Sequence, residues 1–227
     1  MPTFELEHSY PAGTLVFGVD EVGRGPWAGP VMAACVCWPN LEIETDLAAQ
    51  INDSKKLSAA KREILYERIL NSNAIIGVGQ ASSEEIDSLN ILQATFLAMR
   101  RALKQVVGQG YRVDYCLIDG NRLPDWEWKS RAVIKGDSAS LSIAAASIVA
   151  KVLRDRLMAE LGEQYPYYHW ARNAGYGTKD HIEGLKKHGV SPYHRKSYAP
   201  IKALLADSDE SSSPANSLPE TGTGFLF

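Results

Sequence analysis

The sequence predicts an α/β fold in which a mixed β-sheet is flanked by helices and followed by a small C-terminal helical extension. Short β-type runs alternate with longer segments of helical periodicity, which favours helices on the faces of a sheet. A Gly- and Pro-rich loop joins the first two runs, and such a short connection is typical of a hairpin. With 227 residues, 45% of them hydrophobic and 22% charged, the chain can bury a core without disulfides. This composition excludes a disordered chain, a collagen and a small disulfide scaffold.

Five segments are predicted as strands. Residues 14–19 and 31–38 form the hairpin, and residues 74–80 form a third strand. Residues 115–118 are nearly all apolar, so we expect a strand buried on both faces in the centre of the sheet. Residues 132–134 form a brief fifth strand.

Helices are predicted between and after these strands. Residues 58–70 follow an N-cap serine, and a helical region opens at Ser82 and ends at Gly108 and Gly110. Residues 140–161 are rich in alanine, so this helix can pack closely against the sheet. Beyond Tyr165 we expect aromatic loops, a helix over residues 178–188 and a last short helix near Ile201.

The chain divides into a core over residues 1–161, an extension over residues 162–206 and a tail over residues 207–227. The tail is poor in apolar residues and rich in Ser, Pro, Gly and acids, so we expect it to be disordered. Residues 218–222 (LPETG) match a cell-wall sorting signal, but only five residues follow, which favours coincidence or an engineered tag. No apolar run reaches the roughly 18 residues of a membrane span, and the N-terminus lacks signal-peptide features. We expect a soluble, cytoplasmic protein.

The distribution of charge is uneven. The net charge is −3, but the tail holds four acids and no Lys or Arg, so the rest of the chain has 24 Lys and Arg against 23 Asp and Glu. Residues 129–200 hold twelve Lys and Arg, six acids and a run of Tyr and Trp residues. A basic, aromatic-rich half is typical of proteins that bind a polyanion, although an ordinary solvated surface explains the charge count equally well.

Cysteine, serine and histidine chemistry is disfavoured. Cys35 and Cys37 lie on one face of a strand and Cys116 in another apolar run, without a C-x-x-C motif, so we expect buried thiols. The serines near residue 140 have no neighbouring His-Asp arrangement. Four histidines lack zinc-site spacing and are expected at the surface or facing nucleic acid: His169, His181, His188 and His194.

Four acids follow predicted strands. Asp20 and Glu21 end the first strand, Asp119 ends the fourth, and Asp137 lies between a strand and a helix N-terminus. Sites in α/β sheets form beyond strand ends, so these carboxylates can converge, and two divalent cations would balance their charge. Oxygen ligands select Mg²⁺ or Mn²⁺ rather than zinc. The alternative is that these acids cap turns and helices.

The loop after the first strand offers a second candidate site. Its pattern G-x-G-x-x-x-G leads into a β-type run rather than a helix, which excludes a Rossmann dinucleotide site. Gly23, Arg24 and Gly25 would present backbone N–H groups beside a guanidinium, which suits a sugar-phosphate backbone, whereas the alternative is a tight hairpin loop. Four cations are either phosphate contacts or solvated side chains: Lys56, Lys151, Arg154 and Lys179. Lys151 has a further alternative, a place near the acids where it would help to order them.

Six motifs in one collinear order, between about Leu15 and Ala206, resemble those of bacterial ribonuclease HII. They are residues 20–30 (DEVGRGPWAGP), 52–57 (NDSKKL), 119–120 (DG), 135–137 (KGD), 144–151 (AAASIVAK) with 154–155 (RD), and 175–178 (GYGT). The resemblance implies a ribonuclease H-like fold, with residues 1–161 as the catalytic core and residues 162–206 contributing to nucleic-acid binding.

The resemblance also implies roles for single residues. Asp20, Glu21, Asp119 and Asp137 match the family's four metal-binding acids, the Gly-Arg-Gly loop matches its sensor of ribose 2′-hydroxyls, and Tyr176 matches its tyrosine at the ribose-to-deoxyribose junction. The implied enzyme is an endoribonuclease that cuts RNA–DNA hybrids and ribonucleotides embedded in duplex DNA. It cuts 5′ to the ribonucleotide and leaves 3′-hydroxyl and 5′-phosphate ends.

A two-metal hydrolysis follows from this match. Asp20 and Asp119, with Asp137, would hold the ion that activates water, and Glu21 would share the second ion with the scissile phosphate. We expect a monomer. Residues 224–227 (GFLF) are similar to the short peptides that engage sliding clamps, although the usual glutamine is missing; the alternative is an unstructured end without a partner.

Two rival functions remain open at this stage. A Mg²⁺-dependent DNA nuclease or resolvase could use the same sheet, although the Gly-Arg-Gly loop and Tyr176 argue against it. The other is a duplex-binding module whose acids only cap structure. Nuclease activity that needs Mg²⁺ or Mn²⁺ and disappears with EDTA would exclude the module.

Overall fold

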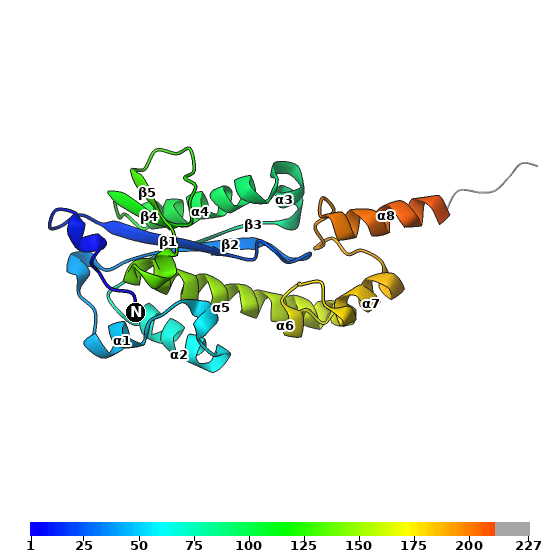
Figure 1. Ribbon diagram of the computed structural model, residues 1–227, viewed down its shortest axis with the longest axis horizontal. Coiled ribbons are helices and arrows are strands. Elements are labelled where there is room, and N and C mark those ends of the chain that lie inside the picture. Colours follow the sequence, from blue (N-terminus) through cyan, green and yellow to red (C-terminus); the bar gives the residue numbers. More distant parts are fainter. Residues whose placement is uncertain (212–227) are drawn as a thin grey trace, which may run out of the picture.

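Five strands form one mixed sheet in the order β3-β2-β1-β4-β5 (Figure 1). The computed structural model describes the backbone of residues 1–211 and the side chains of residues 1–206. The strands are β1 (Val16–Val22), β2 (Val31–Cys37), β3 (Ile75–Ala81), β4 (Tyr115–Asp119) and β5 (Ser130–Val133). All five predicted strands are therefore confirmed.

The pairing of the strands places β1 at the centre of the sheet. β1 and β2 form the predicted antiparallel hairpin, and β3 pairs antiparallel with β2. β4 pairs parallel with β1, and β5 parallel with β4. β4 is buried as expected, but it lies one place from the centre, because the short strand β5 covers its other edge.

Two helices, α3 (Ser83–Leu89) and α4 (Ile91–Gly108), cover one face of the sheet (Figure 1). The sequence predicts a single helical region here, but the chain breaks at Asn90, whose φ is +70°. The Asn90 side chain then accepts hydrogen bonds from the N–H groups of Leu92 and Gln93 and caps α4. The break thus ends one helix and starts the next.

The opposite face is covered by α1 (Thr45–Gln50), α2 (Ala59–Leu70) and α5 (Leu141–Gln164). Ser58 and Ser140 are the N-caps of α2 and α5. α5 packs directly on β1, since a Cβ atom at Gly18 would lie 2.2 Å from the backbone nitrogen of Ile143. This contact fixes the start of α5 against the strand that carries Asp20 and Glu21. α1, with only six residues, has too short a pattern for sequence periodicity and is not predicted.

The C-terminal extension packs on the far end of α5. It contains α6 (Trp170–Asn173), α7 (Lys179–His188) and α8 (Ala199–Ser211). Five 3₁₀-helices complete the secondary structure of the described residues: Glu7–Ser9, Pro39–Leu41, Ser54–Lys56, Gly136–Ser138 and Pro166–Tyr168. Trp170 and Ile201 join Met158 of α5 and Ala28 of the β1–β2 loop in one apolar cluster. The extension is therefore tied to that loop as well as to α5.

The C-terminal tail starts later than the sequence indicates. α8 continues through Ser211, past Asp207, where we expect the tail to begin. Residues 212–227, with the LPETG and GFLF segments, lie outside the described residues. Within the described part of the chain, no helix has the length and apolar character to cross a membrane.

The three cysteines are free and buried, as predicted. Cys35 and Cys37 lie in the same apolar cluster on the α3–α4 face of the sheet. Burial raises the pKa of the Cys37 thiol to about 12 and that of the Cys116 thiol also to about 12. Such thiols are inert packing groups.

Candidate active site

The ends of β1 and β4 bring the predicted acids to one region. Val19 lies opposite Ile118 in the parallel pairing, so the next residues along the two strands, Asp20 and Asp119, follow side by side. Glu21 comes next on β1, and Asp137 lies in the 3₁₀-helix that leads into α5. Asp20 and Asp137 are only 7% and 8% exposed.

The pKa values of these acids show that they act on one another. Burial raises the pKa of Asp20 well above its usual value, and the charges of Glu21, Asp119 and Asp137 raise it further. Burial also raises the pKa of Glu21, although Arg24 opposes the shift. The pKa of Asp137 is raised by burial and by its acidic neighbours Asp53 and Asp119. Four carboxylates therefore share a region whose negative charge Arg24 and Lys55 compensate only in part.

Each carboxylate accepts a hydrogen bond from a nearby group. Asp20 accepts one from the N–H of Glu21 at 2.7 Å, and Glu21 accepts one from Arg24 at 3.2 Å. Asp119 accepts one from the N–H of Gly136 at 2.6 Å. In this arrangement no three Asp, Glu, His or Cys side chains of the described residues come together closely enough to hold a metal ion. The donors are nevertheless all carboxylate oxygens under mutual repulsion, and this chemistry fits a hard divalent cation such as Mg²⁺ or Mn²⁺.

The 3₁₀-helix Ser54–Lys56 and its N-cap Asp53 bring further charged groups to the acids, and two of them, Asp53 and Lys55, were not predicted as site residues. Asp53 contributes to the raised pKa of Asp137 through its charge and a side-chain hydrogen bond. Partial burial lowers the pKa of Lys55, but Asp20, Asp53, Asp137 and Asp119 together outweigh burial and raise it. Lys55 is therefore the lysine whose ammonium group lies within reach of the charges of these acids. Its neighbour Lys56 contacts Ser138 Oγ at 3.3 Å and Asp53 at 3.8 Å.

Two buried arginines, Arg154 and Arg195, support the Gly-Arg-Gly loop. Gly23 has a φ of +91°, and a Cβ atom there would lie 2.1 Å from Nε of Arg154. Arg154 donates hydrogen bonds to the carbonyls of Pro30, Ala28 and Ala174. Burial, and then the charge of Arg195, lower the pKa of Arg154 to about 10. Both alternatives for Arg154, a phosphate contact and a solvated side chain, are wrong, because its guanidinium is buried and donates its hydrogen bonds to backbone carbonyls.

Arg195 is the second buried support of this loop. It donates hydrogen bonds to the carbonyls of Gly23, Arg24 and Gly29 at 2.6 to 3.0 Å. It also donates to the hydroxyl of Tyr198, which in turn donates to the carbonyl of Arg24. The C-terminal extension thus fixes the loop through carbonyl groups, which leaves the Arg24 side chain free to face Glu21.

Tyr176 lies beside the same loop. It is 50% exposed, and a Cβ atom added at Gly25 would lie 3.4 Å from its ring. The backbone carbonyl of Tyr176 accepts a hydrogen bond from Nδ1 of His181 at 2.9 Å. The structure therefore brings Tyr176 and the Gly-Arg-Gly loop together, and Arg24 of that loop pairs with Glu21.

Two other predicted contact residues lie in different surroundings. Lys179 is 89% exposed at the first position of α7, 3.9 Å from Glu183. Lys151 donates to Asp155 at 2.6 Å on α5.

The expectation for His181 and His194 is wrong, because both rings are buried rather than at the surface. His169 and His188 are exposed.

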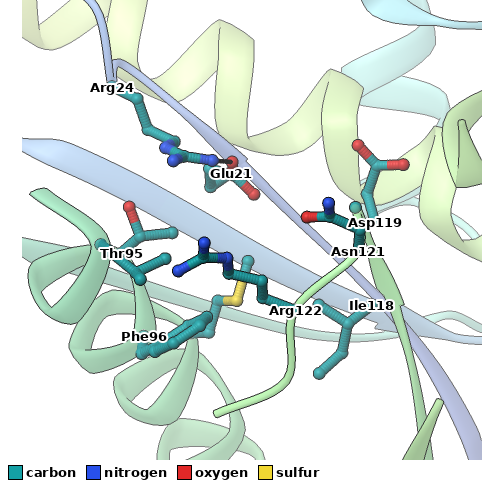
Figure 2. A pocket seen from close by; sticks show the side chains of 11 residues that line it. Glu21, Arg24, Thr95, Phe96, Ile118, Asp119, Asn121 and Arg122 are labelled. Carbon is teal, nitrogen blue, oxygen red and sulfur yellow. Dashed lines mark hydrogen bonds and ion pairs between the residues drawn. The ribbon is translucent and has the colours of Figure 1, made fainter. Parts of the chain in front are cut away.

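A cleft opens on the α4 side of the acids. Glu21 and Asp119 lie on its wall together with Arg24 and Arg122, and side chains of α4 form its floor (Figure 2). Asn121 and Arg122, which follow Asp119 in the loop between β4 and β5, were not predicted as site residues. No motif marks them, and only the fold shows that this loop turns back beside the acids.

Comparison with known proteins assigns the family. The sequence model of the ribonuclease HII family matches residues 17–201. The chain belongs to the ribonuclease HII family. The ribonuclease HII of Wolbachia sp. subsp. Brugia malayi (strain TRS) is 54% identical over 200 residues, covering 88% of this chain and 94% of that protein. The protein is therefore a ribonuclease H, a metal-dependent endoribonuclease that hydrolyses RNA paired with DNA.

Solved ribonuclease structures share the fold. Bst-RNase HIII in complex with Mn²⁺ superposes with a TM-score of 0.72 at 18% identity, covering 92% of this chain and 75% of that chain. The ribonuclease HII in the PCNA:RNase HII complex from Archaeoglobus fulgidus superposes with a TM-score of 0.64 at 25% identity, covering 81% and 95% of the two chains. The ribonuclease H-like fold predicted for this ribonuclease HII family member is confirmed.

Proposed function

We propose that this enzyme cuts the phosphodiester bond 5′ to a ribonucleotide, in RNA–DNA hybrids and at ribonucleotides embedded in duplex DNA, and leaves 3′-hydroxyl and 5′-phosphate ends. One observation carries the proposal: Tyr176 stands beside Gly25, and the adjacent Arg24 pairs with Glu21 of the region that Asp20, Glu21, Asp119 and Asp137 share. A sensor of the ribose and a sensor of the following sugar thus flank one acidic site. A nuclease indifferent to sugar needs neither.

We propose Asp20, Glu21, Asp119 and Asp137 as the residues that hold two divalent ions, Mg²⁺ or Mn²⁺. When bound, the ions supply the positive charge that balances the carboxylates and lowers the pKa of the attacking water. The fit rests on the oxygen donors and on the raised pKa of Asp20. Bst-RNase HIII, which shares the fold, was crystallised with Mn²⁺.

The loop residues would select the ribonucleotide. Backbone groups of Gly23, Arg24 and Gly25 would exchange hydrogen bonds with the 2′-hydroxyl, the group by which a protein distinguishes RNA from DNA. The half-exposed Tyr176 ring would rest against the next sugar, where a second hydroxyl would crowd it. Because Arg154 and Arg195 hold the loop carbonyls, the loop is already shaped before substrate arrives.

Three lysines would bind phosphates of the duplex. Lys56 lies next to Ser138, the residue after Asp137, and Lys179 presents its ammonium at the exposed start of α7. Lys151 forms an ion pair with Asp155, so of the three lysines it is the least available to a phosphate. Binding should weaken with salt, because phosphate contacts release counterions.

The proposal is tested with a substrate panel: all-DNA duplex, duplex DNA with one ribonucleotide, RNA–DNA hybrid and RNA duplex, each with Mg²⁺ or Mn²⁺. The duplex with one ribonucleotide should be cut once, on its 5′ side. Tyr176→Ala should lose more activity on this substrate than on the hybrid, which offers many registers. Tyr167→Ala, which removes a tyrosine of similar exposure (53%) elsewhere, is the control.

One result would contradict the proposal, and another would limit it. Cleavage of the all-DNA duplex at a comparable rate would favour a DNA nuclease. Equal losses for Tyr176→Ala on both ribonucleotide substrates would remove only the role of Tyr176 at the junction.

We also propose a partner for the C-terminal end. A structure is known of the Archaeoglobus fulgidus ribonuclease HII in complex with PCNA, and residues 224–227 (GFLF) are similar to clamp-binding peptides. Deleting residues 217–227 should leave cleavage of naked substrate intact and abolish binding to a sliding clamp. Equal clamp binding by the full-length and shortened chains would refute this role. That the enzyme acts as a monomer stays a prediction.

A further inference from the structure

A cleft of about 500 Å³ lies between α4 and the loop that follows β4, directly beside Glu21 and Asp119 (Figure 2). Its floor is apolar, with Phe96 and Met99 from α4, and its polar side includes Arg122. Of the proposed ribonucleotide sensors only Arg24 lines it, and its guanidinium pairs there with Glu21, whereas Gly23, Gly25 and Tyr176 do not line it. The cleft is therefore a separate surface that borders the same acids.

The charged side chains around this cleft differ in how they are partnered. Glu21 pairs with Arg24 at 3.2 Å, and Asp119 accepts a hydrogen bond from the N–H of Gly136 at 2.6 Å. Among the described residues, Arg122 has neither a hydrogen bond nor an ion pair. Figure 2 shows its guanidinium group reaching into the cleft, toward Thr95 on α4. The cleft thus holds a cation whose charge and five N–H donors are unused.

An unused guanidinium beside two carboxylates calls for an explanation. Arg122 lines the same cleft as Glu21 and Asp119 but bonds to neither of them. Glu21 pairs instead with Arg24, and Asp119 accepts a hydrogen bond from Gly136. An arginine in this state is available to an anion that arrives from outside, and its planar fork matches phosphate oxygens. The apolar floor would lower the local dielectric and strengthen that contact, and it would also pack against a sugar ring.

We propose that Arg122, with the amide of Asn121, binds a non-scissile phosphate of the strand being cut, in the cleft between α4 and the β4–β5 loop. The inference rests on the proposed function, because it takes the scissile phosphate to lie at the acids. Neighbouring phosphates of one strand must then pass close on either side. Asn121 follows Asp119 by two residues and lines the same cleft, so its amide supplies a second donor.

Substrates with one neutral methylphosphonate, placed at successive positions around the ribonucleotide, test this contact. Binding is measured in the Asp137→Asn background, because Asp137 does not line the cleft and the strand should stay intact. At one position the neutral group should weaken binding by the parent, the Asp137→Asn protein, about tenfold. At that same position the neutral group should not weaken binding by the protein that also carries Arg122→Ala, because the contact is already missing. Arg122→Ala should also lower the slope of log Kd against log salt by about one.

The control is Lys104→Ala, which removes an exposed cation from α4 outside the cleft. It should bind every substrate as the parent does. Arg122→Lys, which keeps the charge but loses the planar fork, should recover the salt slope and only part of the affinity. Melting temperatures of the three variants check that each one is folded.

Two outcomes would overturn the inference. If every methylphosphonate weakens the parent and Arg122→Ala equally, Arg122 contacts no phosphate, while cleavage by the wild-type enzyme still supports the proposed function. If the wild-type enzyme cuts no duplex that contains a ribonucleotide, the proposed function fails, and the inference fails with it.

Discussion

The Nε2 atoms of His181 and His194 lie 2.9 Å apart in the interior of the C-terminal extension. Trp170 donates its Nε1–H to Nε2 of His181 at 3.2 Å, so this nitrogen is an acceptor and the proton between the rings belongs to His194. His181 donates through Nδ1 to the carbonyl of Tyr176, and Nδ1 of His194 accepts from the N–H of Ser191 at 2.9 Å. Both rings are neutral, and every ring nitrogen is engaged.

This pair should make the enzyme sensitive to acid. Burial lowers the pKa of His181, and burial, then the charge of His181, lower the pKa of His194 to about 3. In the unfolded chain both pKa values return to about 6.5, so below that pH the unfolded state binds more protons and stability falls. At about pH 5 the loss from His194 alone should be about 2 kcal/mol relative to neutral pH.

Urea unfolding between about pH 7.5 and pH 5 measures this loss. His194→Gln removes the titrating ring and should flatten the dependence on pH, whereas His169→Gln, at an exposed histidine, should not change it. A wild-type free energy of unfolding that stays constant over this range would show that the pair is not held neutral.

Asp119→Asn should abolish cleavage and leave the fold intact. The amide keeps an oxygen that can accept the hydrogen bond from Gly136, so local structure survives, but one ligand charge is lost. Because Asp119 also raises the pKa of Asp20, its loss should relieve repulsion and raise the melting temperature of the metal-free protein. Mg²⁺ should then stabilise the variant less than the wild type. Calorimetry with and without Mg²⁺ measures both effects.

The control for this experiment is Asp125→Asn, at an exposed acid in the same β4–β5 loop. It should cleave normally and respond to Mg²⁺ like the wild type. Near-normal cleavage by Asp119→Asn would discard the assignment of this residue to a metal.

The two glycines of the Gly-Arg-Gly loop should respond differently to alanine. At Gly23 a Cβ atom would meet Arg154 at 2.1 Å and the φ is +91°, whereas at Gly25 the nearest atom is 3.4 Å away on the Tyr176 ring. Gly23→Ala should therefore cost about 1–3 kcal/mol of stability and most of the activity. Gly25→Ala should melt like the wild type. Equal melting temperatures for the two variants would mean that the loop is free to shift.

Much of the fold could be predicted because it rests on local patterns. Short apolar runs mark the five strands, and Ser58, Ser140 and Thr178 mark helix starts that the structure confirms. The break at Asn90 could not be predicted, because Ile86, Leu89 and Leu92 continue a three-residue apolar spacing across it. Only the left-handed backbone of Asn90 divides the region into two helices.

The functional site was harder to predict where neighbouring residues compete for one role. Lys55 and Lys56 are adjacent lysines that the sequence does not distinguish. Only the backbone turn of the 3₁₀-helix places Lys55 where the charges of the acids raise its pKa. His181 and Arg154 are polar residues in a basic half of the chain, so sequence alone favours the surface. Their burial depends on partners far away in the chain, such as His194 for one and the carbonyl of Pro30 for the other.

Arg195 gives the most direct test of whether the C-terminal extension controls the active site. Its guanidinium is buried and reaches the carbonyls of Gly23, Arg24 and Gly29, and no other part of the extension bonds to Gly23 among the described residues. A lysine keeps the charge but cannot reach all three acceptors, so Arg195→Lys should leave buried carbonyls unpaired and cost about 2–4 kcal/mol of stability. Arg172→Lys, at an exposed arginine of α6, is the control and should change neither stability nor activity.

The effect on catalysis separates a positioning role from a merely structural one. If Arg195 shapes the loop that reads the ribose, Arg195→Lys should lose selectivity for the duplex with one ribonucleotide even at temperatures where it is fully folded. Its binding to all-DNA duplex should stay near the wild-type value, because phosphate contacts such as that expected at Lys179 lie elsewhere. The ratio of kcat/KM on the two ribonucleotide substrates measures this selectivity. An unchanged ratio in the folded variant would confine Arg195 to stability and would leave the loop to hold its own shape.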